Sequence, residues 1–159
     1  MAEEESPTKQ AVHLALGRRG EELAAAYLIK HGYRIAAANF SLPVGRNRSG
    51  AVINVEIDLV AYEGETLCFV EVKSRSSDWF APPEANVDRR KQRQIARAAR
   101  AYRRLFDLES APYRYDVVTV VLPPSEGGDT KEFAVQLLRN YWTAADLRKR
   151  VWREHYWDY

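Results

Sequence analysis

The chain has 159 residues, enough for one domain with a hydrophobic core but too few for two. Its 24 basic and 22 acidic residues give a net charge of +2, so charge alone does not indicate a polyanionic partner. The single cysteine excludes an internal disulfide and a cysteine-based zinc site. No apolar run approaches the roughly 18 residues of a membrane span, and the acidic start does not resemble a signal peptide. We therefore expect a cytoplasmic protein without a membrane partner.

The first third of the chain predicts a disordered start, a helix and a short strand. Residues 1–8 are acidic and polar and are expected to be disordered. Helical periodicity follows from Lys9 to His31, with two glycines that could interrupt it, and Gly32 stands where a helix C-cap is expected. Residues 33–40 then indicate a short edge strand, and the proline, glycines and arginines of 41–50 predict a polar loop.

The middle of the chain predicts a hairpin followed by a long helix. Residues 53–62 and 66–73 are rich in β-branched and apolar side chains, and Glu63-Gly64 between them is typical of a tight turn. An amphipathic helix is expected from about Asn86 to Leu108.

The last third predicts two more strands and a terminal helix. Residues 115–122 and 133–138 have strand character, and Thr143 with Asp146 forms a variant capping box that begins a helix. The predicted fold is therefore one α/β domain, residues 9–142, with a mixed β-sheet flanked by helices. Residues 143–159 form an extension rich in Trp and Tyr, which we expect to dock on the domain or on a second subunit of a homodimer.

The predicted hairpin places several charged side chains on one face. If the turn centres on residues 63 and 64, residues whose numbers sum to 127 are opposite each other, and Asp58 and Glu71 become diagonal neighbours about 7 Å apart. Because side chains alternate along a strand, one face should carry charged side chains. That face comprises Glu56, Asp58, Phe69, Glu71 and Lys73. The other face should be apolar, with Val55, Ile57, Leu59, Ala61, Cys68, Val70 and Val72.

Two carboxylates at this separation can hold one divalent metal. Mg²⁺ takes one or two protein carboxylates together with waters and substrate phosphate oxygens. Such an ion converts a bound water into a nucleophile and polarises a phosphoryl group. Lys73, on the same face, could orient that water or offset developing negative charge. The alternative at this stage is a solvated cross-strand ion pair, which is the usual meaning of an isolated Glu-x-Lys triplet.

Several motifs, in this order along residues 12–142, resemble a known bacterial family. They are Gly17-Arg18-Arg19-Gly20-Glu21-Glu22-Leu23-Ala24, Leu28, Gly32, Tyr33, Asn39, Val55-Glu56-Ile57-Asp58-Leu59-Val60-Ala61, Phe69-Val70-Glu71-Val72-Lys73-Ser74-Arg75, Lys91-Gln92 and Arg114-Tyr115-Asp116-Val117-Val118. Together they are similar to the YraN-like proteins, which have a restriction-endonuclease-like fold.

The resemblance implies membership of the PD-(D/E)xK nuclease superfamily, with Holliday-junction resolvases as relatives. By that analogy Asp58, Glu71 and the carbonyl of Val72 bind Mg²⁺ or Mn²⁺, Lys73 is catalytic, and Glu21 completes the acidic site. The implied activity is a metal-dependent endonuclease acting on DNA, including branched or structured DNA.

The long helix adds a candidate nucleic-acid surface. Between residues 87 and 107 eight side chains are basic and two are acidic. We expect Arg90, Lys91, Arg93 and Arg97 to contact a phosphate backbone, which gives affinity without sequence readout. A solvated helix face explains the same pattern equally well. Two further functions remain open, a catalytically inactive nucleic-acid-binding adaptor and a structural partner recruited through the aromatic tail.

Overall fold

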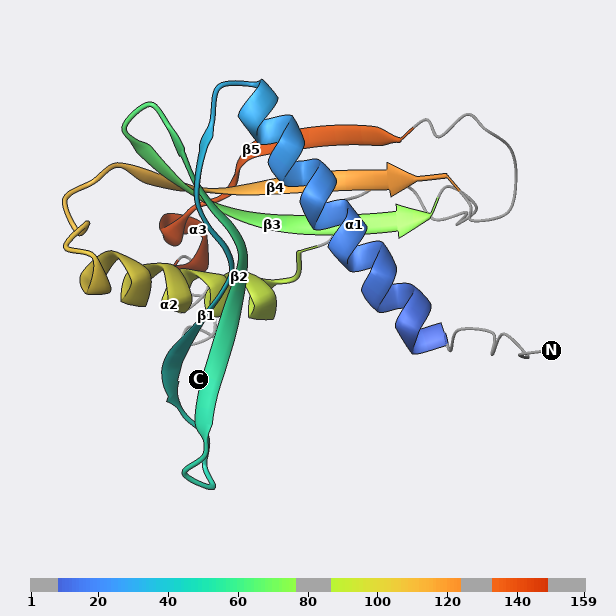
Figure 1. The fold of residues 1–159 in the computed structure, drawn as a ribbon. Helices are drawn as coiled ribbons and strands as arrows, with labels where there is room; N and C mark the ends of the chain where they lie inside the picture. Colours follow the sequence, from blue (N-terminus) through green and yellow to red (C-terminus); the bar gives the residue numbers. More distant parts are fainter. Residues whose placement is uncertain (1–8, 77–86, 124–132, 149–159) are drawn as a thin grey trace, which may run out of the picture.

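The computed structural model describes residues 9–76, 87–123 and 133–148, which form three helices and five strands (Figure 1). In chain order they are α1 (Lys9–Lys30), β1 (Arg34–Arg46), β2 (Val52–Glu63), β3 (Thr66–Ser76), α2 (Arg89–Leu105), β4 (Tyr113–Leu122), β5 (Ala134–Trp142) and α3 (Ala144–Arg148). The strands make one sheet in the order β1-β2-β3-β4-β5. Among the described strands, β3 and β4 pair in parallel and the other neighbours pair antiparallel, so the sheet is mixed.

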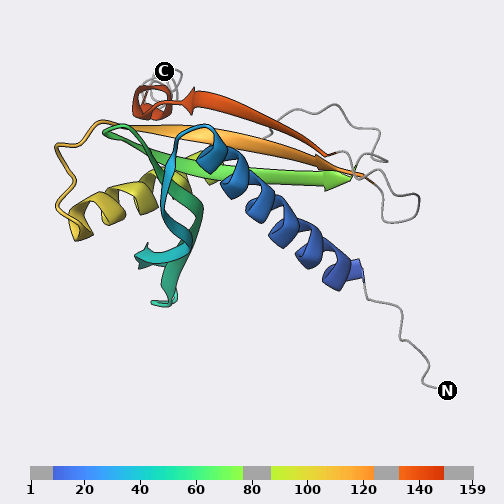
Figure 2. The same ribbon diagram turned by 45° about the horizontal axis from the view of Figure 1, so that its top comes forward.

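The two long helices cover opposite faces of this sheet. Helix α1 crosses one face obliquely and contacts β3 and β4, whereas α2 packs against β1 and β2 on the other face (Figures 1 and 2). Leu28, Val70 and Val118 lie in the core beneath α1, and Phe69 and Ile95 lie in the core beneath α2. This layered α/β arrangement is that of a restriction-endonuclease-like fold, so the predicted fold class is confirmed. Within the described ranges, no helix has the length and apolar character needed to cross a bilayer.

Local sequence explains where α2 begins and where α1 ends. The side chain of Asp88 accepts a hydrogen bond from the Lys91 amide at 2.8 Å, which caps α2 at its first turn. The helix therefore begins three residues later than expected. Helix α1 is continuous through both of its glycines. It ends where Gly32 adopts a φ of +88°, a conformation that favours glycine, as predicted for the C-cap.

The β1–β2 hairpin is longer than the sequence suggested. The predicted strand at 33–40 and polar loop at 41–50 are replaced by one strand that continues to Arg46. The reason is packing, since Leu42 is buried in the core beneath α2. The turn beyond it is held by Asn47, whose side-chain oxygen accepts hydrogen bonds from the amides of Ser49 and Ala51. The hairpin consequently projects beyond the rest of the sheet (Figure 1).

The C-terminal part contains the predicted elements with shifted bounds. Strand β5 runs to Trp142, four residues past its predicted end, because Trp142 is buried against Tyr115. The capping box is confirmed: the Asp146 side chain accepts from the Thr143 amide at 2.9 Å, and the Asp146 amide donates to the Thr143 hydroxyl at 3.2 Å. The predicted disorder of 1–8, and residues 149–159 of the aromatic extension, lie outside the described residues.

The register of the β2–β3 hairpin differs from the predicted one. Leu59 pairs with Val70 and Glu63 with Thr66, so paired residue numbers sum to 129 rather than 127, and the turn is Gly64-Glu65. Gly64 has a φ of +58°, which accounts for its place in the turn. A shift of two residues preserves the predicted faces of β3, because side chains alternate with period two. Cys68, Val70 and Val72 accordingly lie in the core beneath α1.

On β2 the predicted division of faces is wrong for residues 55–58: Glu56 and Asp58 face the α1 side, where Glu21 lies, instead of sharing a face with Phe69 and Glu71, and the sides of Val55 and Ile57 are exchanged accordingly. Val55 and Ile57 pack in the core beneath α2, whereas Leu59 packs beneath α1 and Val60 again beneath α2. Strict alternation is therefore interrupted between Ile57 and Val60. The cause is that β2 pairs with β3 only from Leu59 onward but pairs with β1 along its whole length. Where β2 leaves β3 it changes direction, and Asp58 lies at this fork.

Candidate functional site

Asp58 occupies the first position at which β2 no longer pairs with β3. Its side-chain Oδ2 accepts a hydrogen bond from the backbone amide of Val72 at 2.8 Å. The carboxylate thus accepts a hydrogen bond from a backbone amide of β3 at the position where β2 has separated from β3. This contact fixes the side chain at the fork. The β2–β3 ladder ends at Leu59 and Val70, so the predicted diagonal pairing of Asp58 and Glu71 within the ladder is wrong; the two acids instead lie near each other across the fork.

Two further carboxylates approach Asp58 from different elements. One oxygen each of Glu21, Glu56 and Asp58 lies within 4.8 Å of the others. Glu21 comes from α1, and its pKa is raised by partial burial and by the neighbouring charge of Asp58. Glu56 precedes Asp58 by two residues on β2 and is exposed. The three acids therefore meet on the α1 side of the fork.

Close packing of α1 on β3 brings Glu21 to this position. Gly20, the preceding residue, lies so near β3 that a Cβ added to it would be 1.6 Å from the Ser74 Oγ and 2.7 Å from the Ser74 Cβ. Only glycine permits that approach. Gly20 was predicted merely as an interruption of the helix, whereas the structure shows that it sets the distance between α1 and the sheet.

Glu71 is the most buried acid of the site. Its relative exposure is 5%. Burial, together with the charge of Asp58, raises its pKa to about 7, against the lowering effect of Lys91 and Lys73. The Oε1 atom lies 3.6 Å from the Lys73 Nζ and 3.8 Å from the Lys91 Nζ. The Oε2 atom is buried without a hydrogen-bond partner in the described part of the chain.

These four acids, Glu21, Glu56, Asp58 and Glu71, are called the acidic cluster below. Among the described residues, Lys73 and Lys91 are the cations in ion-pair contact with it, and both contact Glu71. The donors are all carboxylate oxygens, which Mg²⁺ and Mn²⁺ prefer to bind. The unpartnered Oε2 of Glu71 also lacks the compensation that a buried carboxylate requires. The residues present therefore fit a hard divalent cation.

The structure brings together most of the side chains predicted to form the site. Glu21, Asp58, Glu71 and Lys73 converge at the fork, and Lys91 joins them from the first turn of α2. Val72 contributes its amide to Asp58, and its carbonyl remains only a predicted ligand. The other predicted nucleic-acid contacts are exposed on α2, namely Arg90, Arg93 and Arg97.

Glu56 was not predicted as a site residue. Its position two residues before Asp58 was the available signal, because side chains two apart share a face of a strand. The sequence did place both on one face, and the family resemblance assigned Glu21 to the site, but neither indicated that Glu56 would lie close enough to form a three-carboxylate group with them. That proximity depends on how α1 crosses the sheet.

The fold and the fork together define an α/β protein of restriction-endonuclease-like architecture with an acidic cluster at one end of a strand pair. Residues 20–120 match the family described as "Uncharacterised protein family UPF0102". A UPF0102 protein of Koribacter versatilis is 44% identical over 110 residues, which cover 69% of this chain and 71% of the relative. One from Chlorobium limicola is 36% identical over 122 residues, or 77% and 87% of the two chains.

A third relative, from Bacteroides thetaiotaomicron, is 42% identical over 111 residues, which cover 70% of this chain and 83% of the relative. The chain therefore belongs to the UPF0102 family, which is the YraN-like group that its motifs resemble. The family match extends from Gly20 of α1 into β4, so it includes every residue of the acidic cluster.

Proposed function

We propose that this protein is a metal-dependent endonuclease that hydrolyses phosphodiester bonds in DNA in the cytoplasm. One observation carries the proposal. The acidic cluster gathers carboxylates from α1, β2 and β3 at the point where two strands separate, and its most buried member has an oxygen without a hydrogen-bond partner among the described residues. A cluster with such an excess of negative charge is costly unless a cation or solvent compensates it. Perturbed buried acids of this kind are concentrated at functional sites.

Each member of the site has a proposed role. Asp58 and Glu71 hold Mg²⁺ or Mn²⁺, with the carbonyl of Val72 as a further ligand, and Glu21 and Glu56 complete the negatively charged surroundings. Such an ion, when bound, supplies an acidified water and a polarised phosphoryl oxygen. The Val72 amide keeps Asp58 oriented. The side chain of Lys73 is 39% exposed, so its ammonium, next to Glu71, can reach solvent and offset negative charge at the phosphate.

The basic side chains of α2 would position the substrate. Lys91 already contacts the acidic cluster from the first turn of the helix, and Arg90, Arg93 and Arg97 are exposed along the same element. Contacts from these side chains to phosphates would give affinity that falls steeply with salt and does not depend on base sequence. DNA shape, such as a branch or a junction, would then select the site of cleavage.

The decisive experiment is a cleavage panel on the full chain with linear duplex, single-stranded, flap and four-way-junction DNA, each with Mg²⁺, Mn²⁺ or EDTA. Glu21→Gln and Glu22→Gln form a matched pair. Both residues lie on α1, but Glu21 belongs to the acidic cluster, whereas Glu22 is exposed beside Arg19. We expect Asp58→Asn and Lys73→Ala to reduce cleavage by at least about 100-fold. Glu21→Gln should reduce it less, and Glu22→Gln should leave it unchanged.

Binding distinguishes this proposal from an inactive adaptor. Lys73→Ala should lose cleavage while retaining DNA binding. If the wild-type chain cleaves none of the four DNA shapes with either metal, yet binds DNA equally well with EDTA and with Asp58→Asn, it is a nucleic-acid-binding adaptor on a nuclease scaffold. If it neither cleaves nor binds, the nucleic-acid proposal is wrong.

A further inference from the structure

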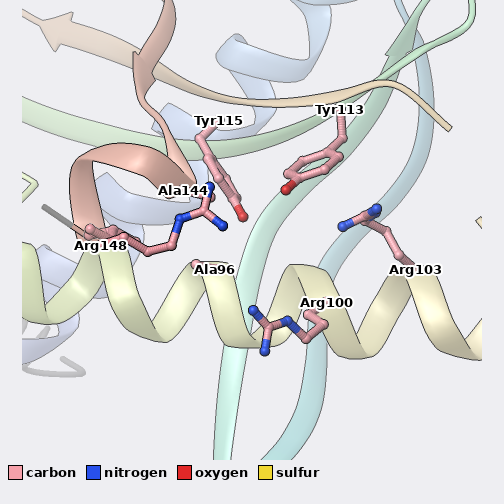
Figure 3. Close-up of a pocket in the computed structure, with 8 residues that line it drawn as sticks. Ala96, Arg100, Arg103, Tyr113, Tyr115, Ala144 and Arg148 are labelled. Atoms are coloured by element: carbon pink, nitrogen blue, oxygen red, sulfur yellow. The ribbon is translucent and has the colours of Figure 1, made fainter. Parts of the chain in front are cut away.

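A second polar site lies between α2, the beginning of β4 and α3. It is a cavity of about 110 Å³. Its lining consists of Ala96, Arg100, Arg103, Tyr113, Tyr115, Ala144, Leu147 and Arg148. None of these residues belongs to the acidic cluster. In Figure 3 the guanidinium groups of Arg103 and Arg148 flank the two tyrosine hydroxyls, and Arg100 projects from the helix below them.

The charged side chains that line this cavity are all positive. Three arginines line it, and no acidic side chain of the described residues does so. Within that part of the chain, neither Arg100 nor Arg148 has a hydrogen bond or ion pair, and both are exposed enough to change rotamer toward a ligand. Like charges gathered around one space repel each other, so the cavity is complementary to an anion.

Part of the cavity wall, namely Tyr113, Tyr115 and Arg103, is held in place before any ligand binds. Tyr115 stacks on Trp142 with ring centroids 4.9 Å apart and planes 4° from parallel. The guanidinium carbon of Arg103 lies 3.9 Å from the centroid of the Tyr113 ring. Its Nη2 donates to the Glu109 carbonyl at 2.7 Å. Preorganised groups lose little conformational entropy when they bind a ligand.

Hydrogen-bond donors are available at neutral pH. The Nε of Arg103 is buried and has no hydrogen-bond partner in the described residues. Burial, with the neighbouring Tyr113, raises the pKa of Tyr115 to about 12, so its hydroxyl keeps its proton. Arginine is the side chain best suited to phosphate, because its planar fork can donate two parallel hydrogen bonds.

The size of the cavity limits the ligand to one small oxyanion group. A volume of about 110 Å³ has room for a few ordered waters or for an anion of a few heavy atoms. Sites for whole small molecules begin at about 300 Å³. A phosphodiester carries a substituent on two of its oxygens and has to pass through its site. A terminal phosphate carries one substituent and can enter a cavity that is walled by α2, β4 and α3.

We propose that this cavity binds the terminal phosphate of a nucleic-acid strand. The choice of a nucleic acid rests on the proposed function, because α2 carries both this cavity and Lys91 of the candidate metal site. Lys91 and Arg100 are nine positions apart, or about 14 Å along the helix axis. That distance corresponds to a few nucleotides at about 3.4 Å per base. The protein would thus measure cleavage from a phosphorylated strand end.

Binding to short strands tests the proposal without any metal. Fluorescence anisotropy in EDTA would compare one labelled single-stranded oligonucleotide bearing a 5′-phosphate, a 3′-phosphate or hydroxyl ends, with inorganic phosphate as competitor. We expect one phosphorylated form to bind about tenfold more tightly than the hydroxyl form, which is the effect of one charge-assisted hydrogen bond. The two phosphorylated arms identify which end is recognised.

Two variants distinguish recognition of the terminal phosphate by this cavity from a general effect of positive charge on oligonucleotide binding. The double variant Arg100→Gln/Arg148→Gln should abolish the preference for the phosphorylated end. Arg104→Gln is the control, because Arg104 is exposed on the same helix, pairs with Glu109 and does not line the cavity. It should weaken all forms equally and keep the preference.

Equal binding of all three oligonucleotides, or a preference that survives in the double variant, overturns the proposal. Binding of inorganic phosphate without any end preference would make the cavity a free-phosphate site and would also overturn it. The test is independent of the proposed nuclease activity. If the chain prefers phosphorylated ends but never cleaves DNA, the terminal-phosphate site stands and the nuclease activity is wrong. If it cleaves DNA but shows no end preference, the nuclease activity stands and the terminal-phosphate site is wrong.

Discussion

Two groups of acidic side chains lie on or against the same sheet and differ in how their charge is compensated. In the first group, Asp116 has no exposed surface, and both of its oxygens accept from the Arg114 Nε at 2.9 Å. The Asn140 amide also donates to it at 2.8 Å. Arg114 further contacts Glu63 at 2.6 Å, and Arg139 contacts Glu63 at 2.9 Å. These residues, Glu63, Arg114, Asp116 and Arg139, are called the arginine-linked cluster below.

In the acidic cluster, by contrast, the negative charges outnumber the positive charges that contact them. Four carboxylates meet there, and the cations that contact them within the described ranges are two lysines at 3.6 and 3.8 Å from Glu71. The pKa of Glu63 is lowered by its hydrogen bond from Arg114, whereas the pKa of Glu71 is raised by burial and by Asp58. A compensated buried acid stabilises a fold, and an uncompensated one is retained for another reason. The comparison therefore separates a structural group from a functional candidate.

The largest expected effect tests the arginine-linked cluster. Arg114→Met should reduce the free energy of unfolding by about 3–5 kcal/mol, because it leaves Asp116 charged and buried without its partner. Urea unfolding followed by circular dichroism measures this loss. Arg139→Met is the control, since that side chain is 55% exposed and its ion pair should contribute less than about 1 kcal/mol. Equal losses for the two variants would contradict the structural role assigned to Arg114.

A smaller effect tests how the acidic cluster is assembled. Gly20→Ala should cost about 1–3 kcal/mol, because the added methyl group collides with Ser74 and forces α1 away from the sheet. DNA cleavage should fall as well, since Glu21 moves with the helix. Gly17→Ala on the same helix meets nothing within 4 Å and should stabilise the protein by up to about 1 kcal/mol. Adding Ser74→Gly to Gly20→Ala should restore part of the lost stability, and failure of that rescue would exclude the collision as the cause.

Replacing the buried acid of the acidic cluster is expected to stabilise the protein rather than to destabilise it. In EDTA at pH 8, above the pKa of about 7, Glu71→Gln should stabilise the protein by about 0.5–2 kcal/mol, because it removes a buried charge beside Asp58. The carboxyl of Glu71 binds a proton more tightly in the native state than in the unfolded chain. In the wild type, Glu71 therefore lowers the free energy of unfolding increasingly as the pH rises toward 7. The gain should therefore be smaller at pH 5. Asp116→Asn should lower stability at both pH values, and a loss of stability in Glu71→Gln at pH 8 would remove the contrast between the clusters.

The smallest expected effect is the pH dependence of the stability that the ion pairs of Glu63 contribute. Because the folded state lowers its pKa, the ion pairs of Glu63 stabilise the protein above the unfolded pKa of about 4.3. Their contribution should be lost as the pH falls through the folded pKa. The side chain is 32% exposed, so we expect less than about 1 kcal/mol. Thermal unfolding of wild type and Glu63→Gln at pH 7 and pH 3 measures it, and a difference that persists at pH 3 would contradict the assignment.

Much of the candidate site could be predicted because its motif lies on one continuous strand. Glu71 and Lys73 are two residues apart on β3, so they share a face whatever the register of the neighbouring strand. The pairing of β2 was less certain, since a turn at residues 63 and 64 and a turn at 64 and 65 are both compatible with the glycine. The observed ladder is shifted by two residues and ends at Leu59 and Val70, one position short of Asp58 and Glu71. The two acids come together because the strands separate beyond that pair, which neither strand's own pattern indicates.

The sequence by itself determined the repeating local patterns: the alternation of β3, the apolar stripe of α2 and the glycine end of α1. These follow from the geometry of each element and need no distant partner. Only the tertiary structure decided where β2 leaves β3, how closely Gly20 lets α1 approach Ser74, and that Glu56 joins Glu21. Those features depend on contacts between segments far apart in the chain, which no local pattern of residues encodes.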